Sequence, residues 1–481
     1  MTITQGILCW AAVVGTFAAG SIQPEPTATA AGTSAAVAYT SDADELGEYD
    51  FSGADFRVLS GIAPYERSYY YSDGENGDIV SDAVWARNQA VAERFNVNIV
   101  GLRTADGEDA NEFVRSAILS GDDSFDAADV DIAASWFFAT NGYFFDLAEL
   151  ECVDLTKAYW DCDLISDLSF GGRSYYALGA ANLDSYDKTH ILAYNKRLAV
   201  NVGVVQPYWR NNKLYNDVTS GGWTLDKFYE YSLVASYDRN GDGRMTSSDC
   251  YGYFADTDDM LAGMCAGAGE RFVTRASDGD FVLAADDNER LSGLYARLKS
   301  QFCNGSCRYG DDDMLIMLFD NAQGLFCDVT LAEFTGLNDS FFEYEPLPYP
   351  KLDESQSEYH SRVESCNATV VPASCPDPEF VGVLLEALAS ESTRGLLQAY
   401  IADCMGINHE RGEGSYELLG TALKSRTIDI GDAVYGEQIL ARLASGLNNP
   451  DIGGLGDILA ESGDELRALI NGVNLRADRA K

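Results

Sequence analysis

The fold of this 481-residue chain is decided by the sequence FRVLSG at residues 56–61, SDAVWARNQAVAERF at 81–95 and VNIV at 97–100. The first and last are short apolar runs typical of strands. Between them, apolar side chains such as Val84 and Val91 recur at helical spacing. The order of strand, helix and strand predicts an α/β unit.

The same alternation continues along the chain. A helix around residues 111–119 leads into a predicted strand at 130–134, and Trp223 precedes a helix for which Thr224 is the expected N-cap. Further strands are predicted at 190–194, 251–254, 324–329 and 367–371, and further helices at 379–404 and 416–424. The predicted fold class is therefore α/β, with enough chain for two domains and a leader.

Composition and charge exclude several classes of protein. Hydrophobic residues make up 46% and charged residues 23% of the chain, which is ordinary for a globular protein. The 76 acidic and 33 basic residues leave a net charge of −43. A chain this acidic repels nucleic acid and anionic lipid, so neither is an expected partner. The acidity favours a well-solvated surface.

The N-terminus predicts export. An apolar run at residues 7–19 is too short to span a bilayer and is typical of a secretory signal. Residues 17–21 resemble a lipoprotein signal in which Ser21 replaces the lipidated cysteine. We therefore interpret residues 1–21 as a leader and 22–53 as a disordered tether.

The cysteines suggest disulfides more than a metal site. Eleven are present, of which Cys9 lies in the leader, and an even number in an exported chain permits disulfides. Cys303 with Cys307 and Cys366 with Cys375 are the first pairs to test, although spacing leaves the connectivity open. A zinc site would need further ligands, and the whole chain has only three histidines.

Residues 238–249 match the calcium loop of EF-hands in spacing. Asp238, Asn240 and Asp242 stand at loop positions 1, 3 and 5, Arg244 would offer its carbonyl at position 7, and Asp249 closes the loop at position 12. A structural Ca²⁺ is the expected cofactor. The alternative interpretation is a surface turn rich in Asp, Asn and Gly.

No catalytic motif stands out. The sequence has no nucleophile elbow, phosphate-binding glycine loop or histidine-centred triad, and the glycines at 267–269 are those of a turn. Two carboxylates could act together on a glycan, but with 76 acidic residues some pair always lies close in space. We therefore do not expect an enzyme.

An ordered series of segments resembles the extracellular solute-binding proteins of family 1, the carbohydrate-binding group that includes maltose-binding protein. The resemblance covers about residues 54–436 and is carried by residues 80–88, 95–97, 121–126, 131–133, 146–147, 171–178, 192–198, 222–228, 347–351, 387–392 and 425–426.

This resemblance implies a type II periplasmic-binding-protein-like fold, in which two α/β lobes are joined by crossing strands and hold a ligand between them. The crossings are expected near residues 181–191 and 362–369. One lobe would comprise residues 54–187 with 370–405, and the other residues 188–365 with the C-terminal helices at 406–481.

The expected ligand contacts lie where predicted strands end, because open α/β sheets bind ligands at that edge. They are Ser60, Gly61, Tyr65, Ser135, Trp136, Asp256, Thr257, Asp328 and Thr330. Trp136 would stack on a sugar face while Asp256 or Asp328 reaches its hydroxyl rim. For Trp136 and Trp223, core packing is the competing interpretation.

The resemblance implies a monomeric receptor outside the cell that delivers a carbohydrate, expected to be an oligosaccharide, to the permease of an ABC importer. Membrane association would then come only through the transporter or an N-terminal anchor. The alternatives are a secreted glycan hydrolase and a calcium-dependent surface adhesion protein. A peptide or amino-sugar ligand also stays open.

Overall fold

The computed structural model describes residues 43–60, 67–104, 109–205, 212–286, 288–310, 314–406 and 413–479, all within one compact unit spanning Ala35–Lys481. The predicted leader, most of the predicted tether, Gly61 and Tyr65 lie outside the described residues. Within these ranges, no helix is both long and apolar enough to cross a bilayer.

The first sheet contains β1 (Ala54–Ser60), β2 (Val97–Arg103), β3 (Ala127–Asp131) and β12 (Asn367–Val370), in the order β12-β3-β1-β2. The first three strands are parallel, and β12 runs antiparallel to β3. Between β1 and β2 the chain forms α1 (Ile79–Phe95), whose first turn is capped by the side chain of Asp78. The predicted strand-helix-strand unit is confirmed.

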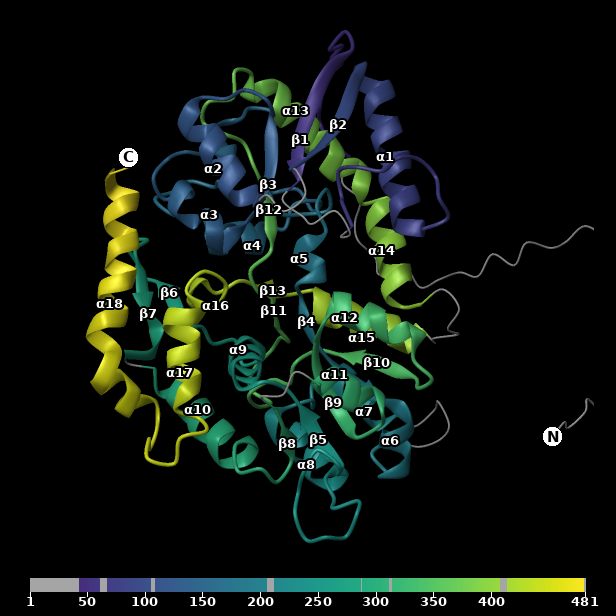
Figure 1. Cartoon of the computed structure of the whole chain (residues 1–481), viewed down its shortest axis with the longest axis vertical. Helices are drawn as coiled ribbons and strands as arrows, with labels where there is room; N and C mark the ends of the chain where they lie inside the picture. The colour runs from purple at the N-terminus through teal and green to yellow at the C-terminus, as the bar shows by residue number, and fades with distance from the viewer. Residues whose placement is uncertain are drawn as a thin grey trace, which may run out of the picture. The chain divides into compact units, whose positions relative to one another are not determined.

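Helices cover this sheet on both sides (Figure 1). α13 (Pro378–Ser392) and α14 (Leu396–Cys404) pack against α1, while α2 (Ala110–Ser120) and α3 (Ile132–Ala139) pack beside β3. α4 (Cys162–Leu168) follows α3 in the chain. The helix predicted at 379–404 is thus two helices, separated at residues 393–395.

The second sheet has the order β10-β4-β9-β5-β8. Its strands are β10 (Tyr344–Leu347), β4 (His190–Asn195), β9 (Gly324–Thr330), β5 (Tyr251–Phe254) and β8 (Arg308–Tyr309). β5 lies parallel to β9 and β8, whereas β4 lies antiparallel to β9 and β10. Four predicted strand positions, at 190–194, 251–254, 324–329 and 367–371, are confirmed to within one or two residues.

Aromatic side chains form the core beneath the second sheet. Phe228 of α8 (Leu225–Ala235) lies 4.9 Å from the ring of Tyr253 and 5.1 Å from that of Phe326. Trp223 is fully buried and donates its indole N–H to the carbonyl of Pro348 at 2.9 Å. Trp223 is therefore a core residue, and Thr224 stands at the expected N-cap position.

Further elements complete the described chain. They include α5 (Asp184–Asp187), α6 (Lys196–Asn201), α7 (Lys213–Thr219), α9 (Thr257–Gly267), α10 (Glu289–Phe302), α11 (Leu315–Asp320), α12 (Leu331–Gly336), α15 (Glu413–Leu423), α16 (Ile430–Ala433), α17 (Ala441–Ser445), α18 (Leu455–Arg479), the hairpin of β6 (Val273–Arg275) and β7 (Phe281–Leu283), and the single turns at Leu147–Glu149, Ala284–Asp286, Leu337–Asp339 and Gly436–Leu440.

Two sequence-based expectations are wrong. The strand predicted at 130–134 ends at Asp131, because the Asp131 carboxylate accepts the N–H of Ala134 at 2.8 Å and caps α3. Residues 132–134 are therefore helical. None of the ten cysteines among the described residues forms a disulfide, so the two suggested pairs are not bonded in this structure.

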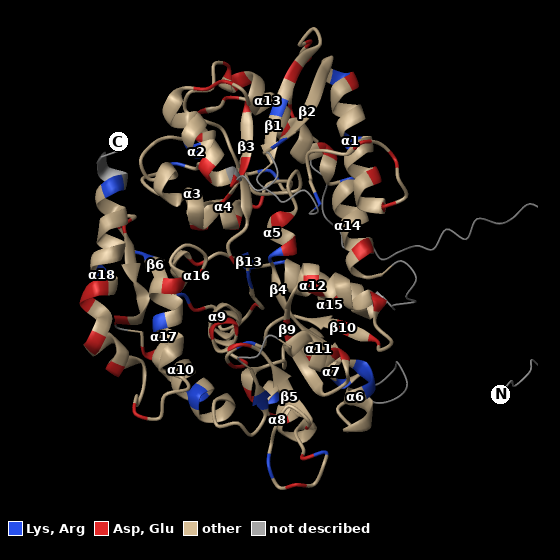
Figure 2. Cartoon of the chain, in the orientation of Figure 1, with Lys and Arg blue, Asp and Glu red and all other residues tan. Residues whose placement is uncertain are grey.

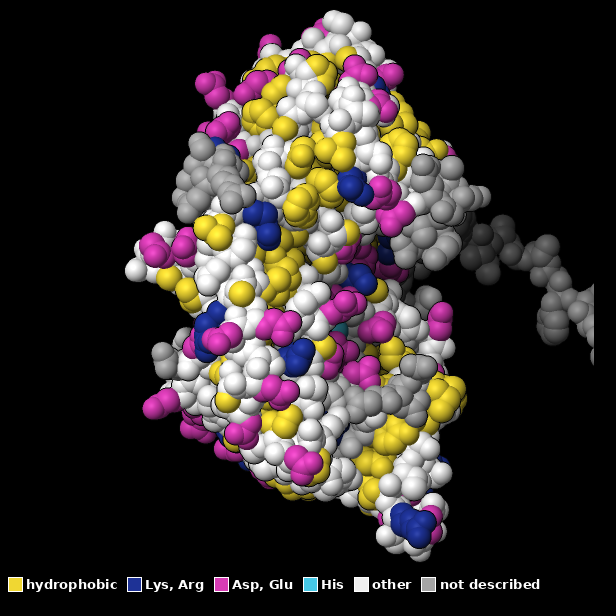
Figure 3. All heavy atoms as spheres, turned by 60° about the vertical axis from the view of Figure 1, so that its left-hand side comes forward, with side chains coloured by type: hydrophobic (Ala, Val, Ile, Leu, Met, Phe, Trp, Pro, Cys, Tyr) yellow, Lys and Arg dark blue, Asp and Glu magenta, His cyan; other side chains and the backbone are white. Residues whose placement is uncertain are grey.

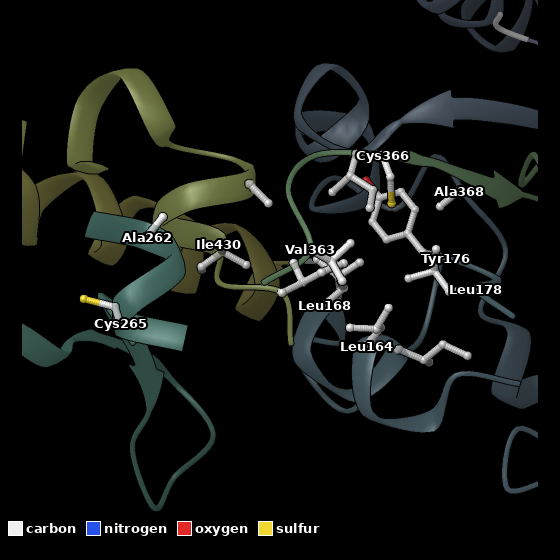
Figure 4. Packing of buried hydrophobic residues seen from close by; sticks show 14 of the residues in the cluster. Leu164, Leu168, Tyr176, Leu178, Ala262, Cys265, Val363, Cys366, Ala368 and Ile430 are labelled. Carbon is white, nitrogen blue, oxygen red and sulfur yellow. The ribbon is translucent and has the colours of Figure 1, made fainter. Parts of the chain in front are cut away.

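The two sheets are joined by strands that run between them. β11 (Ser361–Arg362) pairs in parallel with β13 (Arg426–Thr427), and Val363 pairs with Thr189 just before β4. Val363 then leads towards β12 in the first sheet. Figure 4 shows Val363 between Ile430 and the α4 side chains Leu164 and Leu168. We call residues 361–366 the crossing strand.

Charged side chains surround the crossing strand. His190 is buried and bonds Asp328 through Nδ1 at 2.9 Å and Glu364 through Nε2 at 3.3 Å. Arg362, also buried, donates to both oxygens of Asp432 at 2.6 and 2.9 Å and to Asp259 at 2.7 Å. Buried charges persist only when paired in this way.

The hydrogen bonds between these side chains decide the protonation states of His190 and Glu364. Burial, the largest influence, and the charge of Arg362 lower the pKa of His190, but the bonds to Asp328 and Glu364 outweigh them and raise it to about 10. Burial would raise the pKa of Glu364, but the bond and charge of His190 lower it to about 2. Both groups are therefore charged near neutral pH.

A pH dependence of stability follows. Because the pKa of His190 is raised on folding, its contribution is fully present below about pH 6.5 and is lost as the pH rises towards 10. Melting temperatures measured from pH 6.5 to 10 should therefore fall more steeply for the wild type than for His190→Gln.

His360→Gln is the matched control. Burial, the main influence, lowers the pKa of His360, so its stabilising contribution is lost on acidification and not at alkaline pH. This variant should keep the steep alkaline fall of the wild type. Parallel curves for the wild type and His190→Gln would contradict the account.

Candidate functional site

A pocket of about 410 Å³ lies against the crossing strand. Three segments line it: the start of α9, the crossing strand itself, and the region from α16 to α17. The lining residues are Asp258, Arg362, Glu364, Ser365, Asp432, Gly436, Glu437, Leu440 and Ala441. In Figure 2 the ribbon is coloured for Asp and Glu on α9 and near α16, and Figure 3 shows acidic side chains gathered around a hollow across the middle of one face.

The pocket lies near the carboxyl ends of one strand from each sheet, β5 and β3. Asp258 belongs to the first turn of α9, which begins directly after β5. Ser365 donates its hydroxyl to Asp131 at 2.8 Å, and Asp131 is the last residue of β3. Strand ends of this kind are where open α/β sheets bind ligands.

The lining is strongly acidic. It contains four carboxylates and one guanidinium, and that guanidinium is already paired with Asp432 and Asp259. Glu364 is paired with Lys188 at 3.1 Å as well as with His190. The pocket therefore offers carboxylate oxygens, which accept hydrogen bonds from hydroxyl or ammonium groups, and it disfavours anionic ligands.

Trp136 lies elsewhere than the sequence predicts. It stands on α3 and not after a strand, and its side chain is only 2% exposed. The indole stacks on Tyr176 with ring centroids 6.3 Å apart, and Phe170 and Phe281 pack against it at 5.3 and 6.4 Å. Trp136 thus fills the contact between α3 and β7, and the core-packing interpretation describes it.

The two predicted contacts at the end of β9 also face inward. Asp328 is buried and accepts a hydrogen bond from Tyr349 at 2.5 Å in addition to its bond with His190. Thr330 is the N-cap of α12 and forms a capping box with Glu333. Neither residue lines the pocket. Asp328 is held in the interior by His190 and Tyr349, and Thr330 caps α12.

The other predicted ligand contacts that the structure describes lie near the pocket or in the core. Ser60 is buried at the end of β1, and Ser135 is buried against the hydroxyl of Tyr176 at 3.0 Å. Thr257 bonds Asn448 at 2.7 Å, and Asp256 is half-buried at the N-cap of α9. Asp258, which does line the pocket, directly follows the predicted contact Thr257 in the sequence.

Sequence reasoning missed most of the lining. Arg362, Glu364 and Ser365 fall within the segment where a crossing was expected, so the crossing itself was a usable signal. Asp432 and Glu437 follow β13, in the region where the resemblance implies C-terminal helices. No local motif distinguishes them, because they reach the pocket through the pairing of β13 with β11 and of Arg362 with Asp432.

The calcium-type loop lies apart from this pocket. Its carboxylates bond within the loop: Asp238 accepts the N–H of Gly243 at 2.7 Å, and Asp249, which is buried, accepts those of Arg239 and Thr246 at 2.9 and 2.8 Å. Across the described residues, no group of three or more His, Cys, Asp and Glu side chains is arranged to hold a metal. Calcium binding stays a prediction.

A search with protein-family models gives no match, and a sequence search of the curated proteins gives none either. Solved structures do match. An ABC substrate-binding protein from Listeria monocytogenes, solved in complex with cycloalternan, aligns over 87% of this chain and 99% of its own at 12% identity, with a TM-score of 0.54.

Two further structures have the same fold. A sugar transporter protein from Rhizobium etli, in an open conformation, aligns over 88% of this chain and 99% of its own at 13% identity and a TM-score of 0.56. UgpB from Mycobacterium tuberculosis, in complex with glycerophosphocholine, aligns over 89% and 98% at 15% identity and a TM-score of 0.50. The likeness establishes the architecture: this chain has the two-lobed α/β fold of ABC substrate-binding proteins.

Proposed function

We propose that the chain is the extracellular receptor of an ABC importer and binds a carbohydrate in the pocket at the crossing strand. The observation that carries this proposal is the pocket's position, against the strand that joins the two sheets and near the ends of β5 and β3. Two of the similar structures are, by their names, a sugar transporter and a protein bound to cycloalternan.

The lining suits a polyhydroxylated ligand. Carboxylates such as Asp258 and Glu437 can each accept hydrogen bonds from two neighbouring hydroxyls, while Leu440 and Ala441 offer apolar contact to C–H groups. Ser365 of the lining bonds Asp131 at the end of β3, so a ligand in the pocket would lie beside the first sheet, and closing of the two lobes around it would be favoured. Binding without chemical change is the proposed activity, so the protein is not proposed as an enzyme.

The proposal includes the predicted division of the chain. One lobe comprises residues 54–187 with 370–405, and the other comprises 188–365 with 406–481. The receptor acts as a monomer at the outer face of the cell envelope and delivers its ligand to the permease. Its association with the membrane comes through the transporter or an N-terminal anchor.

Removing pocket charge should weaken binding. In the double variant Asp258→Asn with Glu437→Gln, two acceptors for ligand hydroxyls lose their charge, so the dissociation constant should rise more than about tenfold, or about 1.4 kcal/mol. The ligand is first identified by a thermal-shift screen of oligosaccharides, amino sugars, peptides and glycerophosphodiesters, and affinities are then measured by calorimetry.

Glu461→Gln serves as the matched control, because Glu461 is exposed on α18 and does not line the pocket. Its affinity should equal that of the wild type. Stabilisation of the protein by a sugar without product formation supports the receptor. Sustained hydrolysis of the sugar would replace the proposal with the glycan hydrolase, and unchanged affinity in the double variant would move the site elsewhere.

We also propose that residues 238–249 bind one Ca²⁺ through Asp238, Asn240, Asp242, the carbonyl of Arg244, and Asp249. The spacing supports this proposal, as do the exposed side chains of Asn240 and Asp242. Met245 is half-buried against the core, so the ion would fasten this loop to the body of the protein.

Calorimetry with Ca²⁺ tests the loop directly. One site is expected in the wild type, with loss of the binding heat in Asp242→Ala and a lower melting temperature of the wild type in a chelator. Asp278→Ala, which changes an exposed aspartate in the turn between β6 and β7, should leave the binding heat unchanged. Absence of calcium heat in the wild type would contradict the proposal.

A further inference from the structure

Helix α4 is attached to the first sheet through its preceding segment. The N–H of Asp161, the N-cap of α4, donates to the carbonyl of Leu178 at 2.9 Å, and Ala177 pairs with Thr369 of β12. Leu164 and Leu168 of α4 face Tyr176 and Leu178 in Figure 4. α4 therefore moves with the first sheet.

Arginines from β13 and from the segment before the β6–β7 hairpin contact both ends of this helix. At the start of α4, Arg426 of β13 forms an ion pair with Asp161. In its last turn, Arg271 makes a two-pronged contact with Asp167, with both N–O distances 2.9 Å. Such a fork is the strongest geometry for an arginine and a carboxylate.

Arg275 adds a second contact at the same end. Its guanidinium donates to the carbonyls of Ser166 and Asp167 at 3.1 Å each, at the end of the helix, where the Ser166 carbonyl also accepts the hydroxyl of Ser169 at 2.8 Å. The group also lies over the ring of Phe281, 4.3 Å from its centroid. Arg275 and Phe281 belong to the β6–β7 hairpin, against which α18 packs.

The same contacts reach the segment that lines the pocket. Arg271 also donates to the carbonyl of Ile428 at 3.0 Å, and Asp167 accepts the N–H of Ile428 at 3.1 Å. The next residue, Asp429, accepts the N–H of Val273 at 3.2 Å. Three residues later, Asp432 lines the pocket. One short run of backbone therefore connects α4, the hairpin and the pocket.

We infer that Arg271 and Arg275 form a latch that holds α4 against the hairpin and keeps the two sheets together without ligand. Releasing Asp167 removes the contacts of the α4 end with Arg271 and Ile428, so the two sheets separate more readily around the crossing strand. That the latch also controls ligand entry rests on the proposed function. Its effect on how closely the two sheets are held does not.

Salt should weaken this latch. Arg271 and Asp167 are 30% and 15% exposed, and a cavity of about 270 Å³ lies between the hairpin and α4. Ions can therefore reach the contact, and the screening length falls from about 10 Å at 0.1 M salt to about 3 Å at 1 M. Hydrophobic contacts nearby do not weaken in this way, so a salt dependence identifies ion pairs, of which the Arg271 contact is more exposed than that of Arg426 with Asp161.

Small-angle X-ray scattering of the ligand-free protein tests the inference. The double variant Arg271→Gln with Arg275→Gln should have a larger radius of gyration than the wild type at low salt. The wild type should approach the variant's value as the salt concentration rises to about 1 M. Circular dichroism checks that the variant is folded, and the salt series needs no variant at all.

Arg467→Gln is the matched control. Arg467 makes a comparable fork to Asp286 at 2.7 and 2.9 Å, but both partners pack on the hairpin side. Its radius of gyration should equal that of the wild type. A radius unchanged in the latch variant and in salt would overturn the inference. Because no ligand is used, this outcome is independent of whether a carbohydrate binds.

Discussion

The buried guanidinium of Arg362 is the interaction on which the rest of the structure depends. It lies on the strand that joins the two sheets, and its charge is acceptable there only because Asp259 and Asp432 face it. Removing both partners would leave an uncompensated charge in the interior. The pairing therefore positions α9 and α16 against the crossing strand, and these three segments are the walls of the pocket.

The same charges define what the pocket can hold. Arg362 and His190 neutralise part of the acidic lining, which also contains Asp258 and Glu437. An anionic solute would meet repulsion, whereas a solute rich in hydroxyls or carrying an ammonium group finds partners. The net charge of −43 acts in the same direction, because it repels anionic solutes.

Much of the fold could be predicted from the sequence, because its periodic segments are local. The strands around Phe56, Leu192 and Tyr253 and the helix α1 have the expected type and position. The pattern failed at Asp131, where one capping carboxylate turns an apolar run from strand to helix and places Trp136 in the core.

The candidate site was far less predictable. Asp258 was missed by one residue, because a strand end gives an approximate position and not the direction of each side chain. Asp432 and Glu437 reach the pocket through the pairing of β13 with β11, which joins residues more than sixty positions apart. No local pattern contains that information.

Hydrogen–deuterium exchange with and without a saturating carbohydrate is the most direct test of the central claim. The account predicts slower exchange at residues 257–266, 361–366 and 428–441 in the complex, since ligand and closure together protect the segments that form the pocket. Protection confined to other segments, with these three unchanged, would contradict the claim that the crossing strand lines the binding site.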